Sequence, residues 1–398
     1  MTPLLRRATA DDLRALADVD SRAFGYQQTD EHLENFRPMF EPDRFLLACD
    51  PESGRILGVT GSFPLDVTLP GGAILPAPGV TWVAVDPTVR RRGVLRAMFT
   101  EQHAGFVADG FAVALLTASE GTIYGRFGYG VTTVNRSFEI TRRRAEFRAD
   151  APDPDGVRYV DPETARKLAP DLHRRWCAIT PGAVSRNDAM WDEHLRDDER
   201  SRGGGSALFF LVHADGFASY RVRWSDNSAN VVDLFAATEE AYAALWRVLL
   251  GLDLVEKVTG WKSLALDDPL PLLLTDPRQV RTTSLEDGLW SRVLDVPAAL
   301  AARTYAVEID VVLDVHDDFL QRGGRVRLHG GPEGATCTPT DASADLDLPT
   351  ATLGPLLFGG GRASTYARAG RATGTPGVLR RVDAAFATDR EPLHGTGF

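Results

Sequence analysis

Cysteine is scarce in this sequence, and histidine has no ordered spacing. The 398 residues include three cysteines, at positions 49, 177 and 337, and eight histidines. The cysteines are far apart and odd in number, which fits neither a disulfide framework nor a cluster of metal ligands. No histidine pair has ligand spacing such as His-Glu-x-x-His. The sequence therefore predicts no metal centre and a reducing, cytoplasmic compartment.

Long apolar runs are missing, and negative charge exceeds positive charge. No run approaches the roughly 20 apolar residues that a membrane helix needs, and the first residues lead into polar sequence without an apolar signal core. Lys and Arg number 44 against 55 Asp and Glu, a formal net charge of −11. Such a chain is expected to bind neither nucleic acid nor membrane, and it is a reasonable host for cationic ligands.

What remains is ordinary globular composition. Hydrophobic residues make up 43% and charged residues 25% of the chain, so a sizeable core is expected. The length suits two or three domains.

One stretch, residues 81–96, organises the first third of the chain. Trp82–Val85 reads as a strand, Asp86-Pro87 ends it, and a basic loop precedes a helix that starts at Val94. Free N–H groups at a helix start, together with arginines and a glycine, form a phosphate site. As a bare pattern, a solvated basic face is an equally good interpretation.

The loop Arg90–Leu95, Arg-Arg-Arg-Gly-Val-Leu, resembles the pyrophosphate loop of the GNAT superfamily of N-acetyltransferases. The usual loop, Gln/Arg-x-x-Gly-x-Gly/Ala, ends in a small residue, whereas Leu95 ends this one. The Eis family of bacterial acetyltransferases shares that departure. The resemblance implies acetyl-CoA as cosubstrate, no metal, and these coenzyme-binding residues: Val83, Ala84, Val85, Arg90, Arg91, Arg92, Gly93, Val94, Leu95, Arg96, Ser119 and Glu120.

Residues 1–150 are expected to form the catalytic GNAT domain. Helix, helix, strand and strand precede the central strand, and Phe111–Ala118 reads as a buried strand. The resemblance implies that these two strands splay apart around the acetyl-pantetheine arm, with backbone N–H groups of residues 83–85 facing the thioester. Ser137–Arg142 is predicted to close this domain, before a linker at residues 151–156.

Residues 151–287 resemble a degenerate second GNAT domain. Asn230–Phe235 and Thr238–Leu250 repeat the central strand and helix, but the loop between them, Ala236–Glu240, has two glutamates and neither glycine nor arginine. We therefore predict that this domain does not bind coenzyme A. An unrelated α+β domain is the alternative.

Residues 288–398 resemble the sterol-carrier-like module that ends Eis-family chains. The expected fold is thus α+β, with two tandem GNAT-like mixed-sheet domains followed by a sterol-carrier-protein-like α+β domain. The resemblance covers essentially the whole chain.

Acetyl transfer to an amine needs oxyanion donors, a proton for the departing thiolate and a neutral amine. Ile123–Gly130, Ile-Tyr-Gly-Arg-Phe-Gly-Tyr-Gly, repeats the octet in which the Eis-family tyrosine is the general acid. The resemblance therefore implies that Tyr124 is the acid. The alternative is that Tyr124 is a core tyrosine with a satisfied hydroxyl. On composition alone, Tyr129 is a second candidate for the general acid.

The general base does not stand out within the first domain. In the Eis family it is the carboxylate of a C-terminal phenylalanine, and this chain ends in Phe398. An α-carboxyl group has a pKa of about 3.5, so it is ionised at neutral pH. A frayed tail is the alternative. Gly397 replaces the acidic residue that often precedes the terminal one.

The acceptor pocket is expected to be aromatic, since aromatic faces suit cations. The resemblance implies this set, each of which alone could be a core residue: Phe24, Tyr26, Phe36, Trp82 and Trp191. Tyr26 stands where the family can have an aspartate, so amine selectivity could differ.

The sequence is interpreted as an acetyl-CoA-dependent N-acetyltransferase of Eis type. The resemblance implies aminoglycoside, polyamine or protein-lysine acceptors and a homohexamer. Two alternatives stay open, a non-catalytic lipid- or partner-binding protein with a vestigial coenzyme A site and an N-acetyltransferase for a single metabolite.

Overall fold

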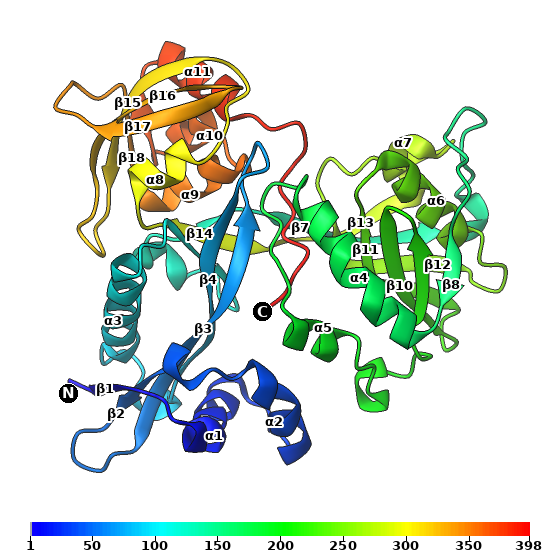
Figure 1. Cartoon of the computed structure of the whole chain (residues 1–398), viewed down its shortest axis with the longest axis horizontal. Helices are drawn as coiled ribbons and strands as arrows, with labels where there is room; N and C mark the ends of the chain where they lie inside the picture. Colours follow the sequence, from blue (N-terminus) through cyan, green and yellow to red (C-terminus); the bar gives the residue numbers. More distant parts are fainter. Residues whose placement is uncertain (1) are drawn as a thin grey trace.

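The computed structural model describes residues 2–398, apart from the side chains of Ser201 and Ser263. Within these residues the chain forms three lobes, each built around a β-sheet with helices packed on it (Figure 1). Each sheet mixes parallel and antiparallel neighbours, which confirms the α+β class. No helix in the described part of the chain has the length and apolar character needed to cross a membrane.

The first sheet has the strand order β1-β2-β3-β4-β5-β14-β6, and only β4 and β5 run parallel in it. Helices α1 and α2 cover the face that carries Leu47 and Val59, and α3 covers the face that carries Leu46 and Leu57. The strands are β1 (Leu4–Arg7), β2 (Leu46–Cys49), β3 (Ile56–Thr68), β4 (Ile74–Val85), β5 (Val113–Thr117), β6 (Gly130–Val131) and β14 (Leu289–Val293), and the helices are α1 (Leu13–Phe24), α2 (Asp30–Phe36) and α3 (Val94–Ala108).

The second sheet has the order β13-β7-β12-β11-β10-β9-β8, with β11 and β12 parallel. Helix α6 packs on one face, and α4 and α5 pack on the other. The strands are β7 (Val134–Thr141), β8 (Arg158–Val160), β9 (Phe209–His213), β10 (Gly216–Arg223), β11 (Ser228–Ala236), β12 (Lys257–Leu264) and β13 (Val280–Asp287), and the helices are α4 (Pro162–Cys177), α5 (Asp188–His194), α6 (Glu239–Leu250) and α7 (Leu270–Leu273).

The third sheet has the order β17-β16-β15-β18-β19. Its strands are β15 (Ile309–His316), β16 (Gly324–Gly331), β17 (Gly334–Pro339), β18 (Leu346–Pro349) and β19 (Thr373–Gly374), and its helices are α8 (Val296–Ala301), α9 (Thr350–Phe358), α10 (Ala363–Arg368) and α11 (Pro376–Phe386).

Two strands change places between the first and second sheets, which corrects one prediction. Ser137–Arg142 was expected to close the first domain, but β7 pairs with β12 and β13 in the second sheet. Phe138 of β7 packs against Trp246 of α6, so the apolar face of β7 lies in the core of the second lobe. The edge of β5 is covered instead by β14, whose five residues are all buried.

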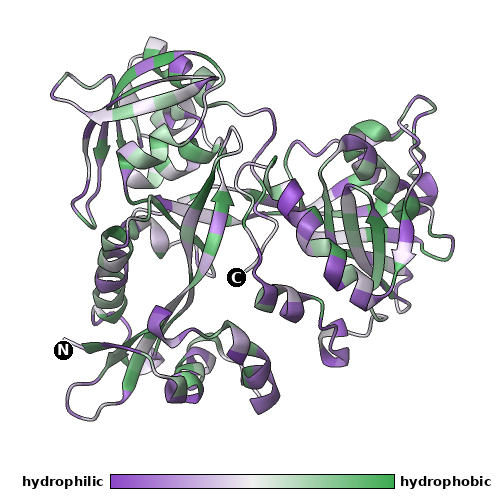
Figure 2. Cartoon of the chain, viewed as in Figure 1, coloured by the Kyte–Doolittle hydropathy of each residue, from purple (hydrophilic) through white to green (hydrophobic). Residues whose placement is uncertain are grey.

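The first and third lobes share a continuous core. Every residue of α9 is buried, and this helix contacts β14 and β6 of the first sheet as well as β15 and β18 of its own. Gly354 allows close packing, since an added Cβ would lie 2.7 Å from the backbone oxygen of Ser291. Figure 2 shows hydrophobic residues along β4, β10 and β11 and mostly hydrophilic residues on α2 and α5. The third lobe is thus packed tightly against the first, so the C-terminal tail begins at a fixed position relative to the first sheet.

Candidate active site

The central strands β4 and β5 diverge in the first sheet. Their parallel pairing consists of Gly79 with Leu115 and Val80 with Leu116. Beyond Val80 the strand bulges against β3, and Trp82 adopts a positive φ of 51°. The pairing with β3 resumes at Ala84, whereas no residue of β4 beyond Val80 pairs with β5. The pairing of β4 with β5 therefore stops before the carboxyl ends of the two strands, the edge at which α/β sheets bind ligands.

The basic loop follows the carboxyl end of β4 and lies directly before α3. Gly93 caps the helix with a φ of 82°, and an added Cβ there would meet nothing within 4 Å. Arg91 and Arg92 are exposed and form no ion pair or hydrogen bond with another described residue. Arg90 donates to the backbone oxygen of Ala23 at 3.1 Å. Open space, free N–H groups and unpaired guanidinium groups fit a pyrophosphate.

Tyr124 lies on the short 3-10 turn Tyr124–Phe127 that follows β5. Its side chain is 4% exposed and packs against Phe99 at 6.1 Å between ring centroids. Burial raises the pKa of Tyr124 to about 12, although a hydrogen bond with Ser119 opposes this shift. The phenol is therefore protonated at neutral pH, as a general acid requires.

Tyr129, the competing tyrosine, already has a hydrogen-bond partner. Its hydroxyl lies 2.7 Å from Nε2 of His103, and Nδ1 of His103 lies 2.8 Å from the backbone oxygen of Phe99. Nδ1 must donate to that carbonyl, so in the neutral ring Nε2 accepts the Tyr129 proton. Both side chains are fully buried. The geometry fits a structural role for Tyr129.

The turn that carries Tyr124 is held from the third lobe. Arg292 of β14 is fully buried, donates to the backbone oxygen of Phe127 and pairs with Asp317 at 2.7 Å. Sequence patterns do not reveal this contact, because Arg292 and Asp317 lie far from the octet along the chain.

Phe398 lies where β4 and β5 diverge. The Thr117 hydroxyl, at the end of β5, donates to an oxygen of the terminal carboxylate at 2.9 Å. The phenyl ring packs over Gly79 of β4, where an added Cβ would lie 2.9 Å from Cε2 of Phe398. The chain end is thus a docked segment in this structure, and Gly79 makes room for it.

The predicted aromatic residues occupy different places around the cleft. Phe36 and Trp82 pack in a tilted arrangement with ring centroids 4.6 Å apart, whereas Phe24 and Tyr26 are 49% and 46% exposed. Tyr26 donates to the buried carboxylate of Asp20. Trp191 is buried in the second lobe under the guanidinium of Arg186, 4.7 Å from its ring centroid. The structure brings Phe36 and Trp82 together and leaves Trp191 apart from them.

Models of known domain families match successive parts of the chain. A model described as an acetyltransferase (GNAT) domain matches residues 5–132. A second model with the same description matches residues 182–293, and a sterol carrier protein domain matches residues 296–395. Together with the diverging strands and the basic loop, these matches define the protein as a GNAT N-acetyltransferase, a class that uses acetyl-CoA.

Full-length relatives narrow this class. The N-acetyltransferase Eis of Mycobacterium tuberculosis is 41% identical over 98% of both chains, and an uncharacterised N-acetyltransferase of Streptomyces coelicolor is 38% identical over 95% of both. The crystal structure of Eis1 from Mycobacterium abscessus superposes with a TM-score of 0.89 at 32% identity, covering 99% of this chain and 100% of that one. The chain belongs to the Eis family of N-acetyltransferases. The predicted family and three-part fold are confirmed.

Proposed function

We propose that this N-acetyltransferase acetylates amines of cationic acceptors of the aminoglycoside, polyamine or lysine type. Tyr124 acts as general acid and the carboxylate of Phe398 as general base. The observation that carries the proposal is the terminal carboxylate at the divergence of β4 and β5, bonded to Thr117. A base is needed at that place because an ammonium group has no lone pair.

The proton transfers follow from the Tyr124 hydroxyl and the terminal carboxylate of Phe398. Acetyl-CoA, when bound, supplies the acetyl group as a thioester. The Phe398 carboxylate takes a proton from the acceptor ammonium through water, which frees the nitrogen lone pair to form the amide bond. After the attack, the nitrogen gives its second proton to solvent. As the carbon–sulfur bond breaks, Tyr124 gives its proton to the departing sulfur, and solvent returns a proton to Tyr124.

Charge and aromatic surface support a cationic acceptor. The chain carries a formal net charge of −11, and the half-buried Trp82, which packs on the buried Phe36, leaves part of its aromatic surface open on the first lobe. Tyr26 covers the carboxylate of Asp20 through a hydrogen bond. Negative potential and aromatic faces both favour an ammonium group.

Only the first domain is proposed to bind acetyl-CoA, at the residues that precede and begin α3. In the second lobe, α6 starts with Glu239 and Glu240, and the Thr238 hydroxyl accepts from the N–H of Ala241 at 3.2 Å. A capped N–H and two carboxylates disfavour a pyrophosphate. Titration calorimetry should therefore give one acetyl-CoA per chain, and Glu239→Ala should leave that stoichiometry unchanged.

The decisive experiment moves the terminal carboxylate. A chain extended by one glycine after Phe398 should lose most of its turnover, about 100-fold or more, because the carboxylate moves by about 3.5 Å. Rates should be measured with acetyl-CoA and a panel of an aminoglycoside, spermidine and a lysine peptide. The same glycine added before Met1 is the matched control.

Three outcomes of that panel have distinct meanings. Turnover of several cationic amines that collapses on C-terminal extension supports the proposal. Full activity in the extended chain removes the carboxylate from the mechanism. Turnover confined to one acceptor identifies a dedicated enzyme and removes the broad acceptor class.

A further inference from the structure

The second lobe repeats the strand divergence of the first, and there the chain's own tail occupies it. Parallel pairing of β11 with β12 ends at Val231 and Gly260. A cavity of about 510 Å³ is lined by the ends of these strands and by residues 393–397. A second cavity, of about 260 Å³, is lined by the end of β11, the start of α6 and residues 389–393. The tail thus runs along the cleft that would be the coenzyme site of a second active domain.

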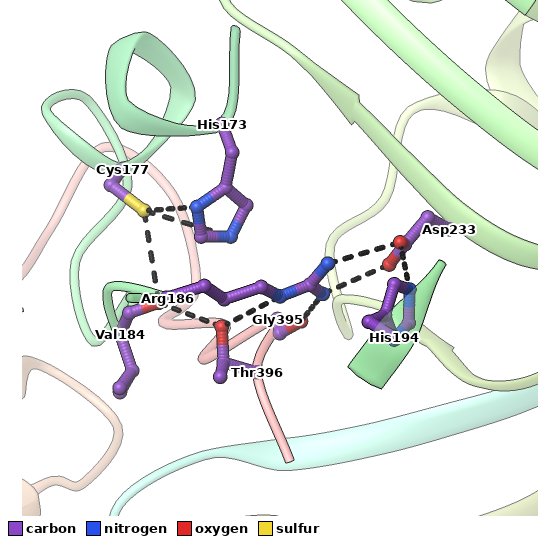
Figure 3. A network of polar contacts seen from close by, with 8 residues as sticks. All are labelled: His173, Cys177, Val184, Arg186, His194, Asp233, Gly395 and Thr396. Carbon is purple, nitrogen blue, oxygen red and sulfur yellow. Dashed lines mark hydrogen bonds and ion pairs between the residues drawn. The ribbon is translucent and has the colours of Figure 1, made fainter. Parts of the chain in front are cut away.

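One arginine joins this cleft to the tail (Figure 3). Both terminal nitrogens of Arg186 bond to the carboxylate of Asp233 on β11, at 3.0 and 2.9 Å. The same guanidinium donates to the backbone oxygen of Gly395 at 2.6 Å and to the hydroxyl of Thr396 at 3.3 Å. His194 makes a further contact with Asp233. A planar fork with five donors suits this set of acceptors.

Burial makes this ion pair costly to break. The Arg186 and Asp233 side chains are 5% and 8% exposed. Burial alone would raise the pKa of the Asp233 carboxyl. The opposite effect of Arg186 and His194 is larger, and the pKa lies well below its usual range. Removing either partner would leave a buried charge uncompensated. The pair is therefore a rigid support for whatever it holds.

A short segment beside Arg186 ties the tail to the catalytic sheet. The Thr396 hydroxyl donates to the backbone oxygen of Val184 at 2.7 Å, and Val184 N–H donates to that of His394 at 3.0 Å. On its other side the segment bonds to β3, where Ser185 N–H donates to the oxygen of Asp66 at 2.9 Å. These hydrogen bonds thus fix the position of Thr396 relative to the sheet that contains β4 and β5.

Gly397 alone separates this support from the terminal residue. It is exposed, and an added Cβ would meet nothing within 4 Å. Since two residues span at most about 7 Å, a fixed Thr396 confines Phe398 to a small volume. Without the support, the contacts with Thr117 and Gly79 would have to hold the chain end alone.

We propose that the second lobe has become a dock for the C-terminal tail, in which Arg186 and Asp233 are positioning residues for the Phe398 carboxylate. This inference rests on the proposed role of that carboxylate as general base. The degenerate domain would then act in catalysis through the tail, without binding coenzyme.

The first test removes the contact from either side. Arg186→Ala and Thr396→Val should each lower kcat, by about 10- to 100-fold for the arginine change, with the KM for acetyl-CoA unchanged. Thr396→Val is nearly isosteric and leaves the Arg186–Asp233 pair intact, so it stays informative if Arg186→Ala fails to fold. A KM that rises with an unchanged kcat would overturn the proposal.

A second measurement does not depend on activity. Carboxypeptidase A releases a C-terminal phenylalanine only from an accessible chain end, so release of Phe398 should be faster in both variants. Arg175→Ala is the matched control, because Arg175 also pairs with an aspartate, Asp215, and donates to a backbone carbonyl, that of Ala214, but away from the tail. Equal release from all chains would contradict a positioning role.

A double-mutant cycle separates this inference from the proposed function. If Arg186 acts through Phe398, Arg186→Ala should cause no further loss in a chain that lacks Phe398. Full activity in the chain lacking Phe398 would overturn the proposed base. A strong loss there, combined with an independent loss from Arg186→Ala, would overturn the positioning role alone.

Discussion

At the scale of single residues, two tyrosines five positions apart have opposite surroundings. Tyr124 packs among apolar side chains beside the cleft, with Ser119 as its polar neighbour. The Tyr129 hydroxyl is bonded to His103. Both come from the same octet, and only their surroundings distinguish the proposed proton donor from a tyrosine with a structural hydrogen bond.

Replacing Tyr124 by phenylalanine should lower kcat by about 100-fold or more, since proton transfer contributes that much in general acid catalysis. The KM for acetyl-CoA should change little, because the ring and its packing remain. Steady-state kinetics at saturating acceptor measure both constants. An equal loss in kcat and in acetyl-CoA affinity would mean that Tyr124 only shapes the cleft.

Tyr129→Phe should have the opposite effect. Loss of this buried hydrogen bond leaves His103 with an unsatisfied nitrogen, which costs about 1–3 kcal/mol of stability. Turnover of the folded enzyme should stay near that of the parent. Chemical denaturation and kinetics on the same preparations check this pair of effects, and a 100-fold drop in kcat would assign the acid to Tyr129.

The raised pKa of Tyr124 predicts the alkaline side of the pH profile. A tyrosine with its ordinary pKa near 10 would lose its proton, and its function, above about pH 9. Burial raises this pKa to about 12, so kcat should not decline between pH 8 and 10. Stopped assays across this range test it, and a fall in kcat with an apparent pKa near the ordinary tyrosine value would contradict the raised pKa of the proposed acid.

Sequence alone predicted the residues that lie in recognisable motifs. Tyr124 was predicted through its octet and Phe398 through its place at the chain end, and both roles stay predictions. The structure places the Phe398 carboxylate beside Thr117 at the end of β5. Thr117 and Arg186 were missed, because each acts through contacts with residues more than 200 positions away. Gly79 carried a weak signal, since glycine inside a strand marks close approach of another group.

At the scale of elements, the phosphate loop combines a helix start with free arginines. Arg91 and Arg92 are exposed and unpaired among the described residues. Replacing both by alanine should raise the KM for acetyl-CoA about tenfold or more and leave kcat nearly unchanged, since charge-assisted hydrogen bonds contribute about 1.5–3 kcal/mol each. Arg143→Ala, at an exposed arginine beside the second sheet, is the control. An unchanged KM at low salt would remove the loop from coenzyme binding.

The exchange of β7 and β14 was the element-scale feature that sequence did not predict. Alternating apolar residues place Ser137–Arg142 in a strand but do not say which sheet it joins. Tertiary contacts determine which sheet each strand joins: Phe138 packs against Trp246, and the buried β14 pairs with β5. The predicted boundaries at 150/151 and 287/288 stay predictions. Strand β7 lies before the first boundary but pairs in the second sheet, and β14 lies after the second boundary but pairs in the first sheet.

At the scale of the whole molecule, the proposed mechanism draws on all three lobes. The first supplies the cleft and Tyr124, the second supports the tail, and the third carries the tail and holds the Tyr124 turn through Asp317 and Arg292. Chain order alone could not show this cooperation, because the tail crosses from the third lobe past the second into the first (Figure 1). The hexamer and the cytoplasmic compartment stay predictions.

The three lobes also share a sensitivity to acid. His103, His173 and His394 are buried, and burial, followed by the nearby charges of Arg292, Arg186 and Lys262 respectively, lowers their pKa values to about 3, 3 and 4. In the unfolded chain each would titrate near pH 6.5. Between pH 6.5 and 4 the unfolded state therefore binds more protons, and stability falls as the pH falls.

By pH 5 this linkage should cost about 2 kcal/mol per histidine, a large share of the 5–15 kcal/mol that stabilises most proteins. Half-buried Asp268, whose pKa is raised by desolvation, acts in the opposite direction. Urea unfolding from pH 7 to pH 5 should show the loss. His394→Asn retains a polar partner for Thr133 but cannot titrate, so it should flatten the slope of stability against pH by about a third.

Because His394 lies in the tail that Arg186 holds, the same titration should release Phe398 to carboxypeptidase A before the whole chain unfolds. A pH-independent stability, or release of Phe398 only at global unfolding, would contradict this coupling.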